Sequence, residues 1–597
     1  MNETTADLLN VSSSESGKKW VLRDYQEKDA LLLSQRLGLP QVVARLLAAR
    51  GFDPNSAASF LQPTLKETMP DPYILKDMEK AVLRIFEAVE KKQKIVIYGD
   101  YDVDGATSSA LLFRYFAALG IVTRVYIPDR IDEGYGPNTL AFDQLKAEKT
   151  DLIITVDCGT TSFDPLSHAA AIGLDVIVID HHAAEPKLPE AWAVVNPNRL
   201  DEPDNPLKEL AAVGMSFLLA VALNRHLRQA GFFKETQEPD LRQLLDLVAL
   251  GTVCDVMPLK GLNRSFVKLG LNIMASRNNV GLKVLSQVTK IDAKPSTYHL
   301  GYVLGPRINA GGRVGEAGLG SLLLRTENPM QAEEIAMRLN EYNQVRKEIE
   351  QDVLQAAFKQ AETQISPVIL TADRDWHPGV IGIVAGRLKE KYYRPSCVVS
   401  ITEEGIGKGS ARSIPGVDLG SIVHAAKQMG ILIAGGGHAM AAGFTVEEKK
   451  IPEFHQFLNT RVEQSTQQDN VPKLYLDGVL NLNSLTPDLV RKIEAMEPFG
   501  SGNPAPKFAL SNIHIFKVDI FAGEHIRILA GQLDRAKINA IAFRAVQTEM
   551  GQALIHHQGK PLHLAGSLKL DTWMGAEKVQ FIIEDVATDN HHFAQAI

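Results

Sequence analysis

At 597 residues, the chain exceeds what one hydrophobic core usually serves, and its length predicts roughly three or four domains. Its composition of 45% hydrophobic, 22% charged and 7% aromatic residues excludes a fibrous or disordered protein. The net charge of −8 excludes a protein that coats nucleic acid nonspecifically, because phosphate affinity comes from clustered Lys and Arg. Any nucleic-acid contact must therefore be local.

The N-terminal segment and the cysteines predict a cytoplasmic protein. No stretch approaches the roughly 18 consecutive apolar residues of a spanning helix, and residues 1–19 lack a basic region followed by an apolar run. We expect residues 1–19 to form a flexible tail. Cys158, Cys254 and Cys397 show no paired short spacing, which argues against a disulfide framework or a thiolate zinc site.

The first half of the chain predicts a helical lead-in followed by an α/β domain. Residues 20–85 place apolar side chains at helical spacing, and residues 86–330 alternate short apolar runs with helical segments. Near-continuous β-branched runs are typical of strands covered on both faces, so we expect a doubly wound, mostly parallel sheet. Its predicted strands contain Ile95–Ile97, Val125–Ile127, Leu152–Ile154 and Val176–Ile179.

The second half predicts a long helix, a second α/β lobe and a small barrel. Residues 331–364 contain neither Gly nor Pro, and a helix of that length spans ~50 Å, which suits a connection between lobes. A glycine-rich α/β lobe follows over residues 365–462. Short alternating segments over residues 471–590 predict an OB-like β-barrel. They are Leu474–Val479, His514–Val518, Ile526–Leu529, Ile538–Phe543 and Val579–Ile583.

Acidic and imidazole groups follow the predicted strands of the first sheet. Asp100, Asp102 and Asp104 alternate between a strand and a helix, Asp157 follows the next predicted strand, and residues 180–182 read Asp-His-His. Ligands of open α/β sheets bind outside the carboxyl ends of strands, so these positions can converge.

Asp255 is the single acid in the apolar stretch 250–258, where an unpaired buried carboxylate would be costly. Several carboxylates crowded together become protonated unless divalent cations neutralise them. Oxygen ligands with one or two imidazoles favour Mn²⁺ or Mg²⁺, and two ions about 3.5 to 4 Å apart form the usual phosphoryl-transfer pair. Each segment alone suits a helix cap, a turn or a surface histidine, but the four together favour a metal centre.

The four segments resemble the motifs of the DHH phosphoesterase superfamily. They are the segments around Asp100 to Gly105, Asp157 to Gly159, Asp180 to His182 and Gly251 to Pro258. The resemblance implies two metal ions, and it implies that Asp102 binds one of them and that Asp157 bridges both. It assigns Asp104, His181 and Asp255 to the other ion, and His182 to the scissile phosphate.

The chain departs from the family pattern at one position. Some relatives carry histidine where this chain has Tyr98, so the first ion needs another ligand, for which Asp100 is the candidate.

Three glycine-rich strings in the second lobe predict a phosphate pocket. They begin at Trp376, Gly407 and Gly435, and glycines let backbone N–H groups approach an anion while a neighbouring Arg grips it. Isolated glycine clusters also serve tight turns, but these strings resemble the DHH-associated substrate-binding domain. The candidate phosphate ligands are Lys408, Ser410, Arg412, Gly435, Gly436, Gly437 and His438.

Residues 305–313 read GPRINAGGR and predict a flexible loop that offers Arg307, Asn309 and Arg313 to nucleic acid. Pairing of these arginines with surface acids is the alternative. This string and residues 497–504 resemble RecJ-type nucleases rather than shorter DHH phosphatases.

The resemblance therefore implies a single-stranded-DNA-specific 5′→3′ exonuclease that releases 5′ mononucleotides by two-metal-ion hydrolysis in DNA recombination and repair. It also implies a helicase and a single-strand-binding protein as partners. One alternative is a DHH phosphodiesterase acting on short oligonucleotides or cyclic dinucleotides. Another is a binding scaffold without catalysis, which the loss of motif carboxylates would mark, and here all are present.

Overall fold

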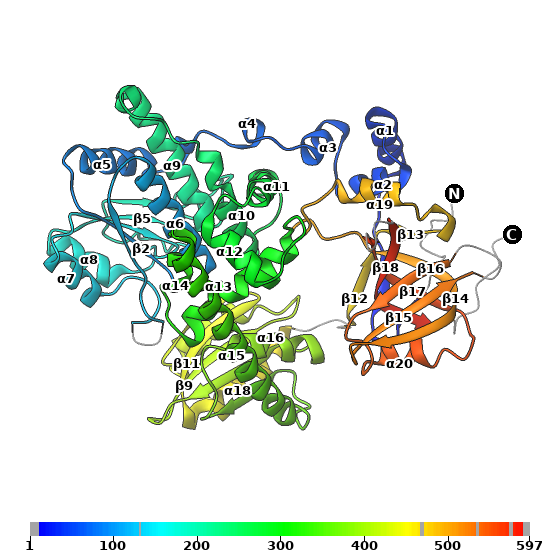
Figure 1. Cartoon of the computed structure of the whole chain (residues 1–597). Helices are drawn as coiled ribbons and strands as arrows, with labels where there is room; N and C mark the ends of the chain where they lie inside the picture. The colour runs from blue at the N-terminus through cyan, green and yellow to red at the C-terminus, as the bar shows by residue number, and fades with distance from the viewer. Residues whose placement is uncertain (1–10, 131–132, 466–470, 533–536, 572–576, 589–597) are drawn as a thin grey trace. The chain divides into compact units, whose positions relative to one another are not determined.

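The computed structural model of the chain describes residues 11–130, 133–465, 471–532, 537–571 and 577–588. It divides into two compact units, each formed by segments distant in sequence (Figure 1). None of the described helices is long and apolar enough to cross a membrane. Unit 1 comprises Met1–Met69, Pro258–Ser265 and Asp469–Ile597, and unit 2 comprises Pro70–Met257 and Phe266–Gln468.

The first lobe of unit 2 is built on a five-stranded parallel sheet in the order β3-β2-β4-β5-β6. On one face Phe142 and Leu166 from α7 and α8 pack against Val96 and Val178, while α6 and α9 contact the sheet from the opposite side (Figure 1). The predicted doubly wound parallel sheet is confirmed, and the sequence prediction missed the edge strand β6. The strands are β2 (Ile95–Gly99), β3 (Thr123–Tyr126), β4 (Leu152–Val156), β5 (Asp175–Ile179) and β6 (Ala193–Val195).

Helices surround this sheet and lead to the second lobe. The main helices are α5 (Met78–Glu90), α6 (Val103–Ala118), α7 (Thr139–Ala147), α8 (Phe163–Ala171), α9 (Ala212–Gln229), α10 (Leu245–Cys254), α11 (Gly261–Ala275), α12 (Val280–Val288), α13 (Gly305–Val314) and α14 (Leu319–Arg325), with the π-helix η5 (His299–Leu304) before α13.

The predicted long helix is confirmed as α15 (Pro329–Ala361), a helix of 33 residues. Asn328 caps it by accepting the backbone N–H groups of Met330 and Gln331, and Pro329 occupies its first turn. The helix contacts α12, α13 and α14 of the first lobe and α16 and β7 of the second. It therefore joins the two lobes, as its length suggested.

The second lobe of unit 2 contains a mixed five-stranded sheet in the order β10-β11-β9-β8-β7. Only β7 and β8 are parallel, so a βαβ unit is followed by antiparallel strands. Its elements are β7 (Ile369–Asp373), α16 (Ile381–Tyr392), β8 (Ser396–Ile401), β9 (Ile406–Arg412), α17 (Leu419–Gln428), β10 (Ala434–His438), β11 (Ala441–Glu447) and α18 (Ile451–Ser465).

Unit 1 packs N-terminal helices against a barrel. One six-stranded sheet has the order β13-β14-β15-β16-β18-β17, and an additional pairing of β14 with β17 closes it, which confirms the OB-like barrel. The sequence prediction missed β17 (Leu562–Asp571). The other elements are α1 (Glu27–Leu37), α2 (Gln41–Ala49), α3 (Pro54–Leu61), α4 (Leu65–Thr68), β13 (Gly478–Val479), α19 (Pro487–Glu494), β14 (Phe508–Phe521), β15 (His525–Gly531), β16 (Lys537–Ala542), α20 (Glu549–Ile555) and β18 (Lys578–Thr588).

Three expectations for unit 1 are corrected. The flexible tail was predicted to reach residue 19, but the described part of it packs, because Val11 is buried beside Trp20 and the backbone N–H of Glu15 donates to Val586. The lead-in also starts with a strand, β1 (Lys19–Leu22), which pairs in parallel with β12 (Lys473–Leu476). Of the predicted barrel strand Leu474–Val479, residues 474–476 thus belong to a separate two-stranded sheet, while Gly478–Val479 joins the barrel sheet as β13. Residues 1–10 lie outside the described residues.

A further correction concerns residues 305–313, which form the helix α13 and not a flexible loop. Their glycines allow close packing, since a Cβ on Gly312 would lie 2.8 Å from the backbone oxygen of Tyr101. Glycine disfavours an isolated helix, but here the contacts with neighbouring elements outweigh that preference. The segment is a rigid element beside the acidic turn that follows β2.

Candidate functional site

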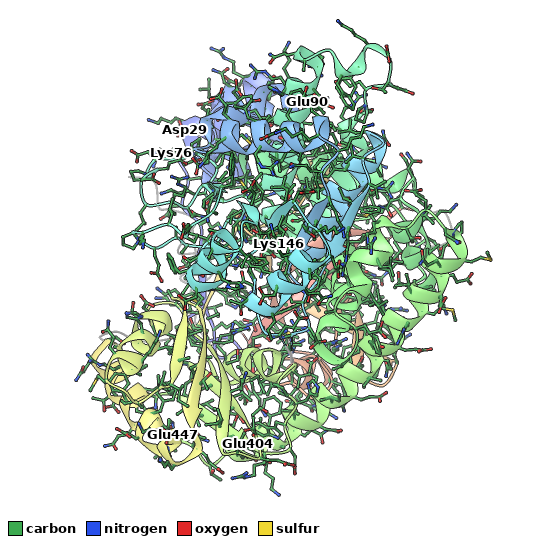
Figure 2. The ribbon with its side chains drawn as sticks, turned by 90° about the vertical axis from the view of Figure 1, so that its left-hand side faces the viewer. Asp29, Lys76, Glu90, Lys146, Glu404 and Glu447 are labelled. Carbon is green, nitrogen blue, oxygen red and sulfur yellow. The ribbon has the colours of Figure 1, made fainter. Side chains whose placement is uncertain are left out.

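Three acidic residues of the site follow three neighbouring strands at the same level. In the parallel register Gly99 of β2 lies opposite Val156 of β4, and Val156 lies opposite Ile179 of β5. The next residues along the chain, Asp100, Asp157 and Asp180, therefore stand side by side at the carboxyl edge of the sheet. All three are buried, whereas charged residues such as Glu90 and Glu404 in Figure 2 are exposed on the surface.

Asp102 and Asp104 are positioned by the start of α6. Asp102 is the N-cap, and its carboxylate accepts the backbone N–H of Gly105 at 3.0 Å. Asp104 is 1% exposed and accepts the backbone N–H groups of Ala212 and Val213 at 2.6 and 2.9 Å. These donors form the N-terminus of α9, whose dipole favours a negative charge there. One acid thus caps its own helix, and the other is fixed by a neighbouring helix.

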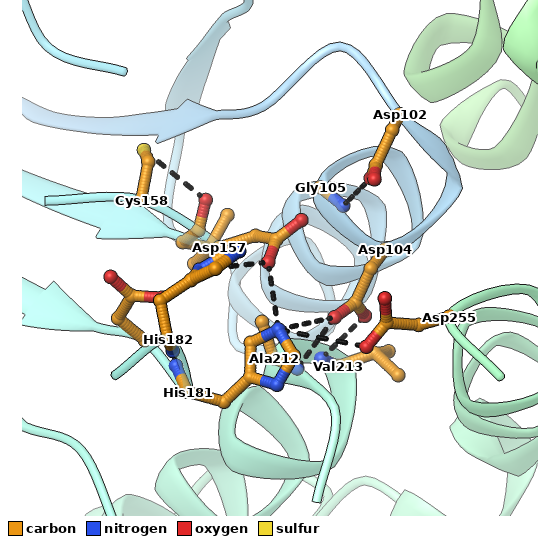
Figure 3. Close-up of polar contacts among 12 residues, drawn as sticks. Asp102, Asp104, Gly105, Asp157, Cys158, His181, His182, Ala212, Val213 and Asp255 are labelled. Atoms are coloured by element: carbon orange, nitrogen blue, oxygen red, sulfur yellow. Dashed lines mark hydrogen bonds and ion pairs between the residues drawn. The ribbon is translucent and has the colours of Figure 1, made fainter. Parts of the chain in front are cut away.

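Asp255 reaches the cluster from the end of α10. Gly251 permits this approach, because a Cβ at that position would lie 2.4 Å from the hydroxyl oxygen of Thr107 and 3.0 Å from a carboxylate oxygen of Asp104. The side chain of Asp255 then lies beside the His181 ring (Figure 3).

His181 lies between carboxylates from three different elements. Its Nε2 atom is 3.3 Å from Asp157, 3.6 Å from Asp255 and 3.8 Å from Asp104 (Figure 3). Burial and the neighbouring His182 lower the pKa of His181 to about 4, so its imidazole is neutral at pH 7. A neutral imidazole facing several carboxylates is a metal-ligand arrangement and not an ion pair.

The donor atoms fall into three overlapping groups that could hold a metal ion. They are Asp104 with His181 and Asp255, Asp100 with Asp102 and Asp157, and Asp157 with His181 and His182. Asp157 belongs to two of these groups.

Tyr98 is not among these groups. Its hydroxyl donates to the carbonyl of Gly136 at 3.1 Å, and its ring stacks on Tyr126. The structure therefore brings together all seven acidic and imidazole residues predicted for the site. Asp100, and not Tyr98, lies in a ligand group with Asp102 and Asp157.

The cluster fits a cation because its negative charges are uncompensated. One carboxylate oxygen each of Asp100 and Asp255 is buried without a hydrogen-bond partner. Burial, and then repulsion from the other carboxylates, raises the pKa of Asp104 to about 7, that of Asp255 to about 9, and those of Asp100 and Asp157 well above the ordinary value. Four acids that resist ionisation together are a site for divalent cations.

Asp180 positions both histidines and does not belong to the metal-ligand groups. One oxygen accepts the backbone N–H of His181 at 2.8 Å and lies 2.8 Å from Nδ1 of His182, and the other accepts the N–H of Thr160 at 3.0 Å. Burial alone would raise the pKa of Asp180, but the two imidazoles and these hydrogen bonds hold it below the ordinary value. Despite burial, the hydrogen bond to Asp180 raises the pKa of His182 to about 9. The sequence pattern places Asp180 in a motif with the two histidines but does not indicate this positioning role.

Asp157 is held in a strained backbone conformation. Its φ of 62° lies in the left-handed region, which Asp and Asn tolerate best among the non-glycine residues. Its N–H donates to Ile179 at 3.0 Å, and its carbonyl accepts the hydroxyl of Tyr135 at 3.0 Å. Tyr135 also lies 3.3 Å from Nδ1 of His182. Sequence reasoning missed Tyr135, because nothing in the pattern of its own segment indicates the contact.

A pocket of about 810 Å³ lies between the two lobes of unit 2. Of the predicted phosphate residues, Arg313, Lys408, Ser410 and Arg412 line it. Arg313 donates to the carbonyl of Gly379 at 2.9 Å, and Arg412 donates to Ser410 at 3.1 Å. Among the described residues, neither arginine forms a salt bridge. The first lobe contributes Tyr101, Arg130 and Tyr135 to the lining, three residues that sequence reasoning missed.

Other predicted phosphate residues lie elsewhere. Residues Gly435 to His438 form β10, which β11 separates from β9, and none of them lines this pocket. Arg307 donates to Asn340 and to the carbonyl of Val303, so it holds α13 against α15. Asn309 lines a smaller cavity of about 150 Å³, which it shares with Arg313.

Comparisons with known proteins match each part of the chain. Three family profiles match: the DHH family, N-terminal domain, over residues 94–252; the DHHA1 domain over residues 364–464; and the RecJ OB domain over residues 476–585. The single-stranded-DNA-specific exonuclease RecJ of Bacillus subtilis is 34% identical over 96% of this chain and 71% of its own length. That of Escherichia coli is 34% identical over 92% of this chain and 96% of its own length.

The fold matches as well. The crystal structure of RecJ in complex with Mn²⁺ from Thermus thermophilus aligns with a TM-score of 0.81 at 28% identity, over 96% of this chain and 80% of that chain. The same protein in complex with Mg²⁺ aligns with a TM-score of 0.75.

Proposed function

The chain belongs to the family of RecJ single-stranded-DNA-specific exonucleases, and on that premise we propose that it degrades single-stranded DNA from the 5′ end with two divalent ions, Mn²⁺ or Mg²⁺. It is a metal-dependent nuclease. The observation that carries the two-ion proposal is the overlap of the ligand groups at Asp157. The alternative of a phosphodiesterase for cyclic dinucleotides or short oligonucleotides is disfavoured by the RecJ OB domain.

Each ion would have its own ligands and share one. Asp104, His181 and Asp255 would hold one ion, Asp100 and Asp102 the other, and Asp157 would bridge them. Bound ions of this kind supply an activated water nucleophile at neutral pH and neutralise charge that develops on the phosphate.

The chain's own residues orient the reacting phosphate. Asp180 engages Nδ1 of His182, so the other ring nitrogen is free to donate to a phosphate oxygen. With a pKa of about 9, the His182 imidazole is charged at neutral pH and can stabilise negative charge on that oxygen. Tyr135, which contacts both Asp157 and His182, keeps this edge of the site rigid.

The polarity proposal rests on the pocket between the lobes. Arg313 and Arg412 are largely buried there without carboxylate partners, and burial lowers the pKa of both guanidiniums. A terminal 5′ phosphate would neutralise them through charge-assisted hydrogen bonds. Tyr101 lies between Asp100 and Asp102, Tyr135 contacts Asp157 and His182, and both tyrosines line the pocket. The reacting phosphodiester would therefore lie a fixed distance inward.

The test compares labelled single strands with Mn²⁺ present. A 5′-labelled strand should release labelled mononucleotide from the first turnover, while a 3′-labelled strand should shorten through a ladder. A 5′ phosphate should outcompete a 5′ hydroxyl, since each charge-assisted hydrogen bond contributes about 1.5 to 3 kcal/mol. Early mononucleotide from the 3′ label, or cutting of a circular single strand, would contradict the polarity.

The same activity indicates partners and a compartment. A nuclease that needs single strands depends on a helicase to supply them, and it meets the single-strand-binding protein that covers them. We propose both proteins as partners. We also propose that the chain acts in DNA recombination and repair, in the cytoplasm.

A further inference from the structure

A second cavity, of about 570 Å³, lies within unit 1 and takes no part in the site described above. It forms where the end of α2 meets the start of α11 and the loop 502–504 of the barrel. Residues 258–265 belong to unit 1, where the backbone N–H of Leu259 donates to the carbonyl of Ser501 at 2.7 Å. The cavity is therefore built from three distant parts of the sequence.

The lining of this cavity is strongly basic. Four basic side chains and one acid face it, which gives the lining a formal charge of +3 in a chain whose net charge is −8. The acid, Asp477, lies 3.7 Å from one of the four, Arg23. The three others are Arg50, Lys260 and Arg264.

One of these cations is buried and another is partly buried, and backbone carbonyls accept the hydrogen bonds of both. Arg264 is 1% exposed and donates to the carbonyls of Phe60, Met496 and Glu497. Arg50 donates to the carbonyls of Leu46 and Pro504, and its Nε has no partner. Neither arginine forms a salt bridge within the described residues. Carbonyl oxygens orient a guanidinium but leave its charge uncompensated, which is costly for the buried Arg264. Asp477 acts electrostatically on Arg50 but forms no salt bridge with it.

The remaining wall is apolar. The rings of Phe52 and Phe60 pack with their centroids 4.4 Å apart, and the guanidinium of Arg264 lies 3.6 Å over the Phe60 ring. Both phenylalanines line the cavity. A wall of this kind suits the sugar or base beside a phosphate, and the volume falls within the range of ligand pockets.

We propose that this cavity binds a backbone phosphate of the single-stranded DNA substrate, so that unit 1 has a phosphate site of its own. The inference rests on the proposed function, because that function makes a DNA strand the anion that the protein handles. Arg50 and Lys260 supply the free N–H donors, while Arg264 contributes charge and fixes the wall.

The test is equilibrium binding of a labelled oligothymidylate to the full-length protein in EDTA, over a range of salt concentrations. Lys260→Gln should weaken binding about threefold, as for an exposed contact, and Arg50→Gln about tenfold. Each should flatten the log-log salt slope by about 0.7, the contribution of one phosphate on a single strand. Lys28→Gln is the matched control, since Lys28 is exposed on α1 and outside the cavity, and it should change neither quantity.

Each outcome decides the proposal. Lys260 is exposed and has no side-chain hydrogen bond or ion pair in the described part of the chain, so its variant should fold even if Arg50→Gln does not. Unchanged affinity and slope in folded Lys260→Gln would overturn the site. The site would also be overturned if folded Lys260→Gln lost binding of thymidine monophosphate alone, or of an acidic peptide alone, and still bound the oligothymidylate normally. Hydrolysis by the wild-type protein in Mn²⁺ tests the proposed function separately.

Discussion

Asp157→Asn should separate a metal-bridging carboxylate from a structural one. Asn tolerates the φ of 62° at this position, whereas Ala would add roughly 1 to 2 kcal/mol of backbone strain. The carboxylate of Asp157 accepts no backbone N–H among the described residues, so the substitution removes no cap. It also removes a carboxylate whose own pKa is raised by burial and by repulsion from the neighbouring carboxylates. The metal-free variant should therefore be as stable as the wild type, or more stable.

The metal-bound state should respond in the opposite direction. A cation present at a hundred times its Kd stabilises the folded state by about 2.7 kcal/mol. For a unit this large, that corresponds to a rise in Tm of roughly 5 °C. Asp157→Asn should lose most of this rise together with hydrolysis, because Asp157 belongs to two of the three ligand groups.

The assay is thermal unfolding of both proteins with EDTA and with increasing Mn²⁺, alongside hydrolysis of single-stranded DNA. Asp246→Asn is the matched control, since Asp246 is an equally buried acid on α10 that lies outside the ligand groups. It should keep the Mn²⁺-dependent rise. A folded Asp157→Asn protein with a full rise in Tm and near-normal hydrolysis would refute the bridging assignment.

Three further predictions follow from other contacts. Asp180→Asn should lower kcat roughly 10-fold to 100-fold. It should also shift the alkaline limb of the pH–rate profile to lower pH, because the hydrogen bond that raises the pKa of His182 to about 9 is lost. An alkaline limb at unchanged pH would contradict this role of Asp180. Arg412→Ala should weaken single-strand binding and flatten the salt slope by about 0.7, measured by anisotropy. The pKa values of Asp104 and Asp255 are raised to about 7 and about 9, so the metal-free folded state holds protons that the unfolded chain releases near pH 4. The contribution of these two groups to stability in urea should therefore be greatest below pH 4, be lost as pH rises to about 9, and disappear in saturating Mn²⁺.

The sequence predicted the parts of the fold whose signal is local. The strands β2, β4 and β5 are continuous β-branched runs, and α15 has a long uninterrupted helical pattern. The pairing of β1 with β12 could not be predicted, because it joins residues more than 400 positions apart through short strands. The helix α13 was misread because its glycines indicate flexibility in isolation, whereas the packing partner that needs them, Tyr101, is far away in sequence.

The acidic cluster was more predictable than the phosphate pocket. Its acids follow parallel strands, and parallel register brings equivalent strand ends to one edge, so position along each strand predicts proximity. The pocket has no such rule. Arg130 and Tyr135 enter it from a loop of the first lobe, while β10, with its conspicuous glycines, lies one strand too far from β9.

Asp102 illustrates why the choice between a helix cap and a metal ligand is not exclusive. Its carboxylate accepts the N–H of Gly105, as a cap does, and the same side chain lies in a ligand group with Asp100 and Asp157. The cap fixes the rotamer, which removes the entropy cost of ordering a ligand when a cation binds. Asp104 gains the same preorganisation from the N-terminus of α9. A helix start at the end of a parallel strand can therefore supply both the ligand and its support.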